Sequence, residues 1–230
     1  MKPEISVIIP AYKEEKSISI CLGSLLLQTL KTNSEIIVVY TKSNDNTEKI
    51  LKFFSKYKVI KTKEKTGAAK ARNIGAQKAR GDILAFIDAD TMACPNWINE
   101  IKKGLEKNVA LTGPVKPLFA EHITDHTLFD IFSSLSRMSI KVRPIVIGSN
   151  LACKKEAFMK VGGFRHIKSL EDIDFGFRLS KIGKIGFSKK MIVYSSLRRI
   201  KASKLETLNY LINYMRLELK IPTEKMKDWR

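Results

Sequence analysis

Two aspartates separated by one alanine, Asp88-Ala89-Asp90, follow directly on the apolar run 83–87. A short apolar run of this kind is typical of a buried strand, so its end would carry both carboxylates out of a core. Carboxylate oxygens suit hard cations such as Mg²⁺ and Mn²⁺, whose sites commonly leave coordination positions for substrate phosphates. A solvated acidic turn is the alternative, since acidic residues are mostly exposed. The elements around the triplet favour the metal site.

Strands and helices alternate along the first 90 residues. Buried strands are predicted at 5–10, 35–40, 57–61 and 83–87, with helices between them at 15–30, 47–56 and 67–79. This alternation predicts an α/β fold with a mainly parallel central sheet flanked by helices. Ligands of such sheets bind at the carboxyl ends of the strands, where Pro10-Ala11-Tyr12, Tyr40-Thr41 and Asp88-Ala89-Asp90 fall. Three strand ends at one crevice predict a nucleotide site.

The pattern is looser after residue 95. We expect helices at 97–107, 118–140, 154–161, 169–182 and 203–221, and strands at 144–153 and 190–194. A turn is expected at Gly148-Ser149-Asn150 within the first of these strands. No internal repeat or low-complexity linker is visible. We therefore predict one domain over residues 1–200 and a basic, amphipathic helical appendage over 201–230.

Composition narrows the class of protein. Hydrophobic residues make up 44% of the 230, enough for a full core. The three cysteines are far apart and odd in number, which predicts no disulfide framework and fits a reducing compartment. No apolar stretch reaches the length of a membrane-spanning helix, and residues 1–4 lead straight into a strand rather than a signal peptide. We expect a cytoplasmic protein.

The net charge of +19 predicts an anionic partner or serves solubility. Residues 181–230 hold thirteen Lys and Arg against four Asp and Glu, a net of +9 (13 − 4). The helix predicted at 203–221 combines these charges with an apolar stripe, so it could lie on an anionic membrane surface or pack on the core. A peripheral position on the inner face of the cell membrane is our preferred interpretation.

Five short blocks in order give the chain a resemblance to glycosyltransferase family 2, the inverting GT-A fold transferases that use nucleotide-sugars. The similarity extends over roughly residues 4–200. The blocks are Ile9-Pro10-Ala11-Tyr12-Lys13-Glu14, Ser43-Asn44-Asp45-Asn46-Thr47, Gly67-Ala68-Ala69-Lys70-Ala71-Arg72-Asn73, Phe86-Ile87-Asp88-Ala89-Asp90 and Glu171-Asp172-Ile173-Asp174-Phe175.

The resemblance implies a role for each matching residue. Asp172 would be the catalytic base, with Glu171 beside it. Asp88 and Asp90 would hold the divalent cation, Mn²⁺ or Mg²⁺, that bridges the donor diphosphate, and Arg72 would lie near these carboxylates and the diphosphate. The remaining residues implied to line the nucleotide-sugar are Pro10, Ala11, Tyr12, Glu14 and Ala89. The partners it implies are a UDP- or GDP-sugar donor and a glycan or lipid-linked acceptor.

General chemistry agrees with these roles. A nucleoside diphosphate leaves readily when its developing charge is neutralised by a metal or a basic side chain. An inverting displacement then needs one carboxylate to take the acceptor's proton. Asp172 lies far in sequence from the Asp88 pair and could face it across the crevice. The alternative for Glu171-Asp172 is simple stabilisation of a helix N-terminus.

Two positions depart from the family pattern. The second strand ends in Thr41, where the family usually has an acidic residue that binds the base, so the donor base stays open between uridine and guanosine. No histidine follows the last strand, where the family often has one that reaches the metal. Arg198 and Arg199 follow it instead and could bind the diphosphate bidentately or form a solvated basic turn.

Three other functions remain as alternatives. A nucleic-acid-binding protein is suggested by charge alone, but no helix-turn-helix, zinc-finger or ribonucleoprotein motif is visible, and we expect no nucleic-acid partner. A sugar-1-phosphate nucleotidyltransferase would carry a Gly-rich, Arg-containing loop after the first strand, unlike residues 10–14. An inactive relative that binds only a nucleotide or a lipid is the third alternative, against which the intact Asp88, Asp90 and Asp172 argue.

Overall fold

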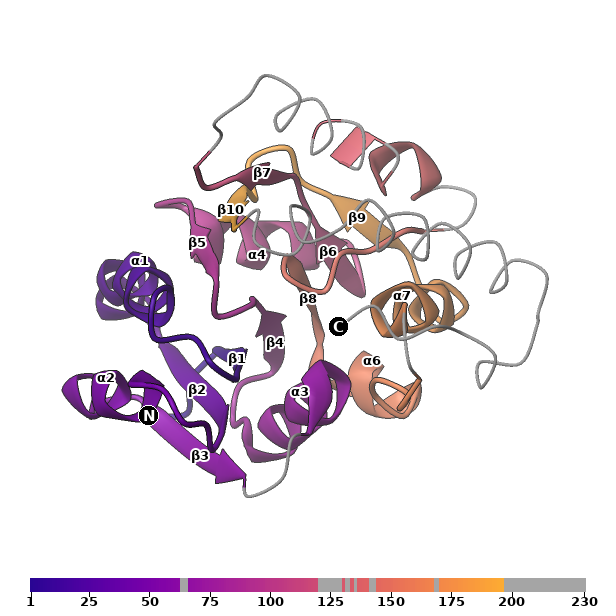
Figure 1. Cartoon of the computed structure of the whole chain (residues 1–230). Helices are drawn as coiled ribbons and strands as arrows, with labels where there is room; N and C mark the ends of the chain where they lie inside the picture. The colour runs from indigo at the N-terminus through magenta and orange to yellow at the C-terminus, as the bar shows by residue number, and fades with distance from the viewer. Residues whose placement is uncertain are drawn as a thin grey trace.

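The computed structural model describes residues 1–62, 66–119, 130, 133–134, 136–140, 144–167 and 170–196. Its centre is a seven-stranded sheet with the order β3-β2-β1-β4-β8-β6-β9 (Figure 1). The first four strands in this order are parallel, and β8 is antiparallel to both of its neighbours. The α/β prediction with a mainly parallel sheet is therefore confirmed.

The amino-terminal half follows the predicted alternation. Continuous apolar and β-branched runs form β1, β2 and β4, and all but the ends of these strands are buried. The elements of this half are β1 (Ile5–Ala11), α1 (Ile18–Lys31), β2 (Ser34–Thr41), α2 (Thr47–Phe53), β3 (Lys58–Thr62), α3 (Gly67–Lys78) and β4 (Ile83–Phe86).

Alternate side chains of each central strand enter two separate cores. Val7, Ile9 and Val38 pack with α1 and α4 on one face of the sheet. Ile8, Ile37 and Val39 pack with α3, α6 and α7 on the other. Because α3 and α7 share this second face, residues distant in sequence can meet where β4 ends.

The second half is built from shorter elements. These are β5 (Thr91–Ala93), α4 (Trp97–Leu105), β6 (Ala110–Thr112), β7 (Val115–Pro117), β8 (Leu151–Lys154), α6 (Lys155–Lys160), α7 (Glu171–Ser180), β9 (Ile185–Phe187) and β10 (Val193–Ser195). Strands β5, β10 and β7 form a second sheet, which starts immediately after Asp90. This sheet anchors the residues that follow the Asp-Ala-Asp triplet.

Some predictions for this half were wrong or lie outside the described residues. Only residues 151–153 of the strand predicted at 144–153 lie in a strand, β8, and residues 144–147 are irregular. The turn predicted at Gly148-Ser149-Asn150 is present. The short strands β5, β6, β7 and β9 were not predicted. Most of the helix predicted at 118–140, and all of the appendage at 201–230, fall outside the described residues.

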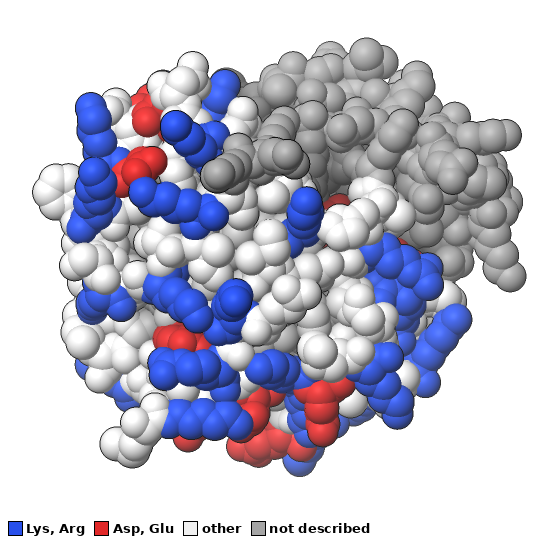
Figure 2. Space-filling model, turned by 90° about the horizontal axis from the view of Figure 1, so that it is seen from below, with Lys and Arg blue, Asp and Glu red and all other residues white. Residues whose placement is uncertain are grey.

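Among the charged side chains on the face seen in Figure 2, Lys and Arg are spread widely and Asp and Glu are fewer. None of the described helices is both long and apolar enough to cross a membrane.

Candidate functional site

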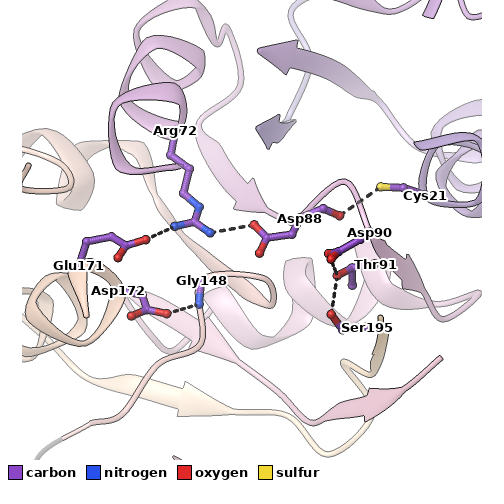
Figure 3. A network of polar contacts seen from close by, with 9 residues as sticks. All are labelled: Cys21, Arg72, Asp88, Asp90, Thr91, Gly148, Glu171, Asp172 and Ser195. Carbon is purple, nitrogen blue, oxygen red and sulfur yellow. Dashed lines mark hydrogen bonds and ion pairs between the residues drawn. The ribbon is translucent and has the colours of Figure 1, made fainter. Parts of the chain in front are cut away.

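Arg72 joins the two acidic motifs of the sequence. Its Nη2 lies 2.8 Å from Asp88 Oδ1 at the end of β4, and its Nη1 lies 3.0 Å from Glu171 Oε1 at the start of α7 (Figure 3). The Arg72 and Glu171 side chains are 2% and 3% exposed, and that of Asp88 is 14% exposed. The guanidinium also lies 5.4 Å from the ring centroid of Phe164. The buried Arg72 guanidinium therefore forms ion pairs with two carboxylates, Asp88 after β4 and Glu171 at the start of α7.

The charge of Arg72 is held by its surroundings. Burial alone would lower its pKa, but the negative charges of Asp88, Glu171 and Asp172 outweigh burial and raise the pKa. Both terminal nitrogens donate to carboxylates, while the buried Nε has no hydrogen-bond partner among the described residues. The structure thus places Arg72 against the carboxylates, as predicted, with its terminal nitrogens engaged there.

Asp172 is held by two backbone amides. Its Oδ2 accepts a hydrogen bond from the Gly148 N–H at 2.8 Å, and its Oδ1 accepts one from the Ile173 N–H at 2.9 Å. Helix α7 begins immediately after Leu170, whose φ of 63° is uncommon for a bulky residue. This backbone turn sets Glu171 and Asp172 side by side at the helix start. Asp172 is half-buried, and Glu171 is buried.

Asp90 is held by contacts with Thr91 and with the end of β10. Its carboxylate is almost fully buried and accepts a hydrogen bond from Thr91 Oγ1 at 3.4 Å. Thr91 Oγ1 also lies 3.1 Å from Ser195 Oγ and can accept that hydroxyl's proton while it donates its own to Asp90. The Ser196 N–H donates to the Asp90 carbonyl. The end of β10 therefore reaches Asp90, at the position where the sequence lacks the histidine common in the family.

The acids near β4 produce a region of negative potential. The pKa of the Cys21 thiol is raised first by burial and then by the charges of Asp90, Asp88 and Glu14. Among the described residues, no three His, Cys, Asp or Glu side chains gather into a metal site. Asp88 and Asp90 still fit a hard cation, because two carboxylates in a negative region leave positions for phosphate oxygens and water. A cation here would depend on the substrate for part of its coordination.

The predicted nucleotide edge is arranged by a second polar network. Pro10 and Ala11 end β1, next to β2, which ends in Thr41. The Glu14 carboxylate is buried and accepts a hydrogen bond from the Ser17 hydroxyl at 2.6 Å. The Glu14 N–H donates to Thr47 Oγ1 at 2.8 Å. The half-buried Tyr12 lies between Ala11 and this network.

Asp45 and Thr47 complete this network, although the sequence analysis gave these two members of a family block no role of their own. The Thr47 hydroxyl donates to Asp45 Oδ2 at 2.7 Å, and the same carboxylate oxygen accepts from the Glu15 N–H at 3.2 Å. The Asn44-Asp45-Asn46-Thr47 block was the signal that could have found them. The loop after β1 is therefore tied to the loop after β2.

The position predicted to bind the base carries neutral hydroxyls. Thr41 Oγ1 lies 3.0 Å from Thr62 Oγ1 and 3.4 Å from Thr66 Oγ1. A hydroxyl can donate and accept, so this trio can meet either kind of base edge. Arg198 and Arg199 lie outside the described residues.

A parallel half-sheet with acids just after β4 and at the start of α7 is the architecture of the GT-A fold. Comparison with known families agrees: the model "Glycosyl transferase family 2" matches residues 6–162. The chain belongs to glycosyl transferase family 2, as its five sequence blocks predicted.

Relatives support this assignment, and a solved structure shares the fold. An uncharacterized glycosyltransferase of Haemophilus influenzae is 28% identical over 76% of this chain and 61% of its own length. The Escherichia coli UDP-Glc:alpha-D-GlcNAc-diphosphoundecaprenol beta-1,3-glucosyltransferase WfgD is 36% identical over 46% of this chain and 43% of its own. The mannosyltransferase PcManGT of Pyrobaculum calidifontis, solved with GDP-Man and Mn²⁺, superposes with a TM-score of 0.71 at 20% identity over 94% of this chain and 65% of its own. The chain thus spans about three-fifths of the length of the first relatives it matches.

Proposed function

We propose that this chain is an inverting, metal-dependent glycosyltransferase that moves a sugar from a nucleotide-diphosphate donor to an acceptor hydroxyl or phosphate. The observation that carries the proposal is the Arg72 bridge. A single guanidinium contacts Asp88, beside the predicted metal position, and Glu171, beside the predicted base. The donor-side and acceptor-side carboxylates therefore lie within one side chain of each other, as a direct displacement at one carbon requires.

Four residues of the site are assigned a role in this reaction. Asp88 and Asp90 would hold a divalent cation, which when bound neutralises charge on the diphosphate oxygens as a Lewis acid. The acceptor oxygen forms a bond to the anomeric carbon while the bond from that carbon to the diphosphate oxygen breaks. Asp172 takes the hydroxyl proton, and the nucleoside diphosphate leaves with the electron pair. Arg72 pairs with both Asp88 and Glu171 and so fixes the position of one relative to the other.

A hydroxyl acceptor and a phosphate acceptor can be distinguished by whether transfer requires Asp172. A hydroxyl must lose a proton as it attacks, whereas a phosphate anion is already deprotonated at neutral pH. WfgD, by its name, acts on a diphosphoundecaprenol-linked sugar, which supports a lipid-linked glycan as the acceptor class. The net charge of +19 supports a peripheral position on an anionic membrane surface, at its cytoplasmic face. The two arginines Arg198 and Arg199 remain candidates for the diphosphate.

A thermal-shift screen with UDP and GDP, each with and without Mn²⁺, tests the donor side. A ligand that binds only the folded state raises its stability by about 2.7 kcal/mol at 100 times its Kd. We expect one nucleotide to stabilise the protein only with Mn²⁺, and Asp90→Ala to remove that effect. Asp82→Ala is the matched control, because Asp82 is an exposed aspartate paired with Lys2.

Asp172→Ala tests the acceptor side in the same assay. We expect this variant to keep metal-dependent nucleotide binding and to lose transfer to a hydroxyl acceptor. Normal transfer by Asp172→Ala would show that another group is the base. Nucleotide binding without transfer by the wild-type protein, for every donor and acceptor offered, would favour the inactive relative.

A further inference from the structure

The backbone N–H of Gly148 reaches Asp172 from outside α7. It donates to Oδ2 at 2.8 Å, and Figure 3 shows it approaching the carboxylate from a separate segment of the chain. A backbone donor to an ionised carboxylate is a strong, directional contact. Gly148 is buried, so water does not compete freely for this contact. The position of Asp172 therefore depends on where the chain places residue 148.

The segment that carries Gly148 is anchored in the core. Asn150 is fully buried, and its N–H donates to the Ile147 carbonyl, which closes a turn around Gly148. The Asn150 side chain donates to the Pro114 and Met191 carbonyls at 3.0 and 2.8 Å. Its Oδ1 accepts the indole N–H of Trp97 at 2.8 Å. These bonds to three separate segments of the chain fix the turn before any substrate binds.

Only glycine leaves room for Arg72 at this position. A Cβ at residue 148 would lie 2.8 to 2.9 Å from three atoms of the Arg72 guanidinium. A Cβ atom essentially never comes this close to a non-bonded heavy atom, so one of the two residues would have to move. Arg72 cannot swing aside at low cost, because it is buried and paired with Asp88 and Glu171. The missing side chain of Gly148 therefore lets one turn meet both the guanidinium and the Asp172 carboxylate.

We propose that Gly148 is the positioning residue for the catalytic carboxylate: its N–H orients Asp172, and its lack of a Cβ keeps Arg72 between the donor-side and acceptor-side acids. This inference rests on the proposed function in taking Asp172 as the base. The turn at residues 147–150 then acts as a prebuilt support, of the kind that holds reacting groups within a fraction of an ångström. A positioning residue should affect kcat while leaving donor affinity nearly unchanged.

Gly148→Ala is the test, with Gly23→Ala as the matched control. Gly23 is exposed on α1, and a Cβ there would meet nothing within 4 Å. We expect Gly148→Ala to fold, to keep the Mn²⁺-dependent affinity for the nucleoside diphosphate within about threefold, and to lose about 10²-fold in kcat, as a displacement near 1 Å does. Gly23→Ala should transfer at the wild-type rate. An unchanged kcat in Gly148→Ala would overturn the proposal.

The Arg72→Lys background separates positioning from general damage. The shorter ammonium removes the forked group that a Cβ at 148 would strike. Gly148→Ala should therefore cost several-fold less in kcat in Arg72→Lys than in the wild type, a non-additive double-mutant cycle. An equal loss of kcat from Gly148→Ala in both backgrounds would show that Arg72 is not what requires a glycine at position 148, and would contradict the proposal.

An NMR measurement decides the matter independently of activity. The amide proton of residue 148 should resonate at low field in the wild type because it donates to a carboxylate. It should move upfield in Asp172→Asn and in Gly148→Ala, and stay in place in Gly23→Ala. If the wild type transfers no sugar, the proposed function fails while this readout still tests the contact. No upfield movement in either variant would refute the Gly148 inference alone.

Discussion

Replacement of Arg72 by methionine is the most direct test of the bridge between the acidic motifs. Methionine has a similar length and no charge, so the change removes both ion pairs and leaves most of the volume filled. Glu171 would then keep a carboxylate that is only 3% exposed without its cation. Removal of one partner from a buried pair costs about 3–5 kcal/mol, because the remaining charge is uncompensated.

The pair Arg80–Glu35 supplies the matched control. Arg80 Nε lies 3.1 Å from Glu35 Oε2, and the Arg80 side chain is 65% exposed. Glu35 is 12% exposed but would keep its hydrogen bonds from the Ser6 hydroxyl and the backbone N–H of residue 80. Exposed pairs contribute up to about 1 kcal/mol. We therefore expect Arg72→Met to lose at least about 2 kcal/mol more than Arg80→Met.

Urea denaturation at pH 7 measures both losses as shifts of the transition midpoint, with an unchanged m-value. The double variant Arg72→Met/Glu171→Gln should recover part of the loss, since it removes the uncompensated charge together with its partner. Equal stability of Arg72→Met and Arg80→Met would refute the claim that the buried ion pairs of Arg72 stabilise the fold more than an exposed arginine does. A double variant less stable than Arg72→Met would point to packing rather than charge as the reason.

Three further predictions concern the supports of the site. Burial alone would raise the pKa of Asp45, but hydrogen bonds from Ser43, Thr47 and the Glu15 N–H lower it. A lowered folded-state pKa stabilises above the unfolded value of about 3.9, so the melting-temperature deficit of Asp45→Asn should be present at pH 7 and shrink below about pH 4. Gly81→Ala should lose about 1–3 kcal/mol in urea denaturation, because its Cβ would lie 2.7 Å from the Ser6 backbone nitrogen. Asn150→Ala should lose at least about 2 kcal/mol by the same method and weaken protection of the Trp97 indole N–H from exchange, since buried groups lose their partner.

The long elements were predictable because they depend on local pattern. Strands β1, β2 and β4 are continuous apolar runs, and their order along the chain implies parallel pairing. The three-residue strands β5, β6, β7 and β9 carry no such pattern, since their pairing depends on partners far along the chain. Residues 144–147 resemble a strand in composition but are irregular, and they lead into the turn predicted at Gly148-Ser149-Asn150.

In the candidate site, too, some residues could be predicted from the sequence and others could not. Asp88, Asp90, Arg72 and Asp172 were predicted by residue type and motif, and the structure brings Asp88, Arg72 and Glu171 into contact across 99 residues of sequence. The Gly148 N–H could not be predicted as a partner of Asp172, because every residue except proline has a backbone N–H. Its signal is three-dimensional: a glycine whose absent side chain would overlap a buried guanidinium.

Stability and geometry are separate contributions of Arg72, and they can be measured apart. Buried ion pairs can often be replaced by uncharged groups with little loss of stability, so the free energy of unfolding alone does not explain why a charge is buried here. If Arg72→Met/Glu171→Gln folds well but transfers sugar slowly, the guanidinium acts chiefly by fixing where Asp88 and Gly148 lie relative to Asp172. If stability and transfer recover together, charge compensation is its main role. The first outcome follows from the contacts described, because the double variant restores neutrality but places no group between the Gly148 turn and Asp88.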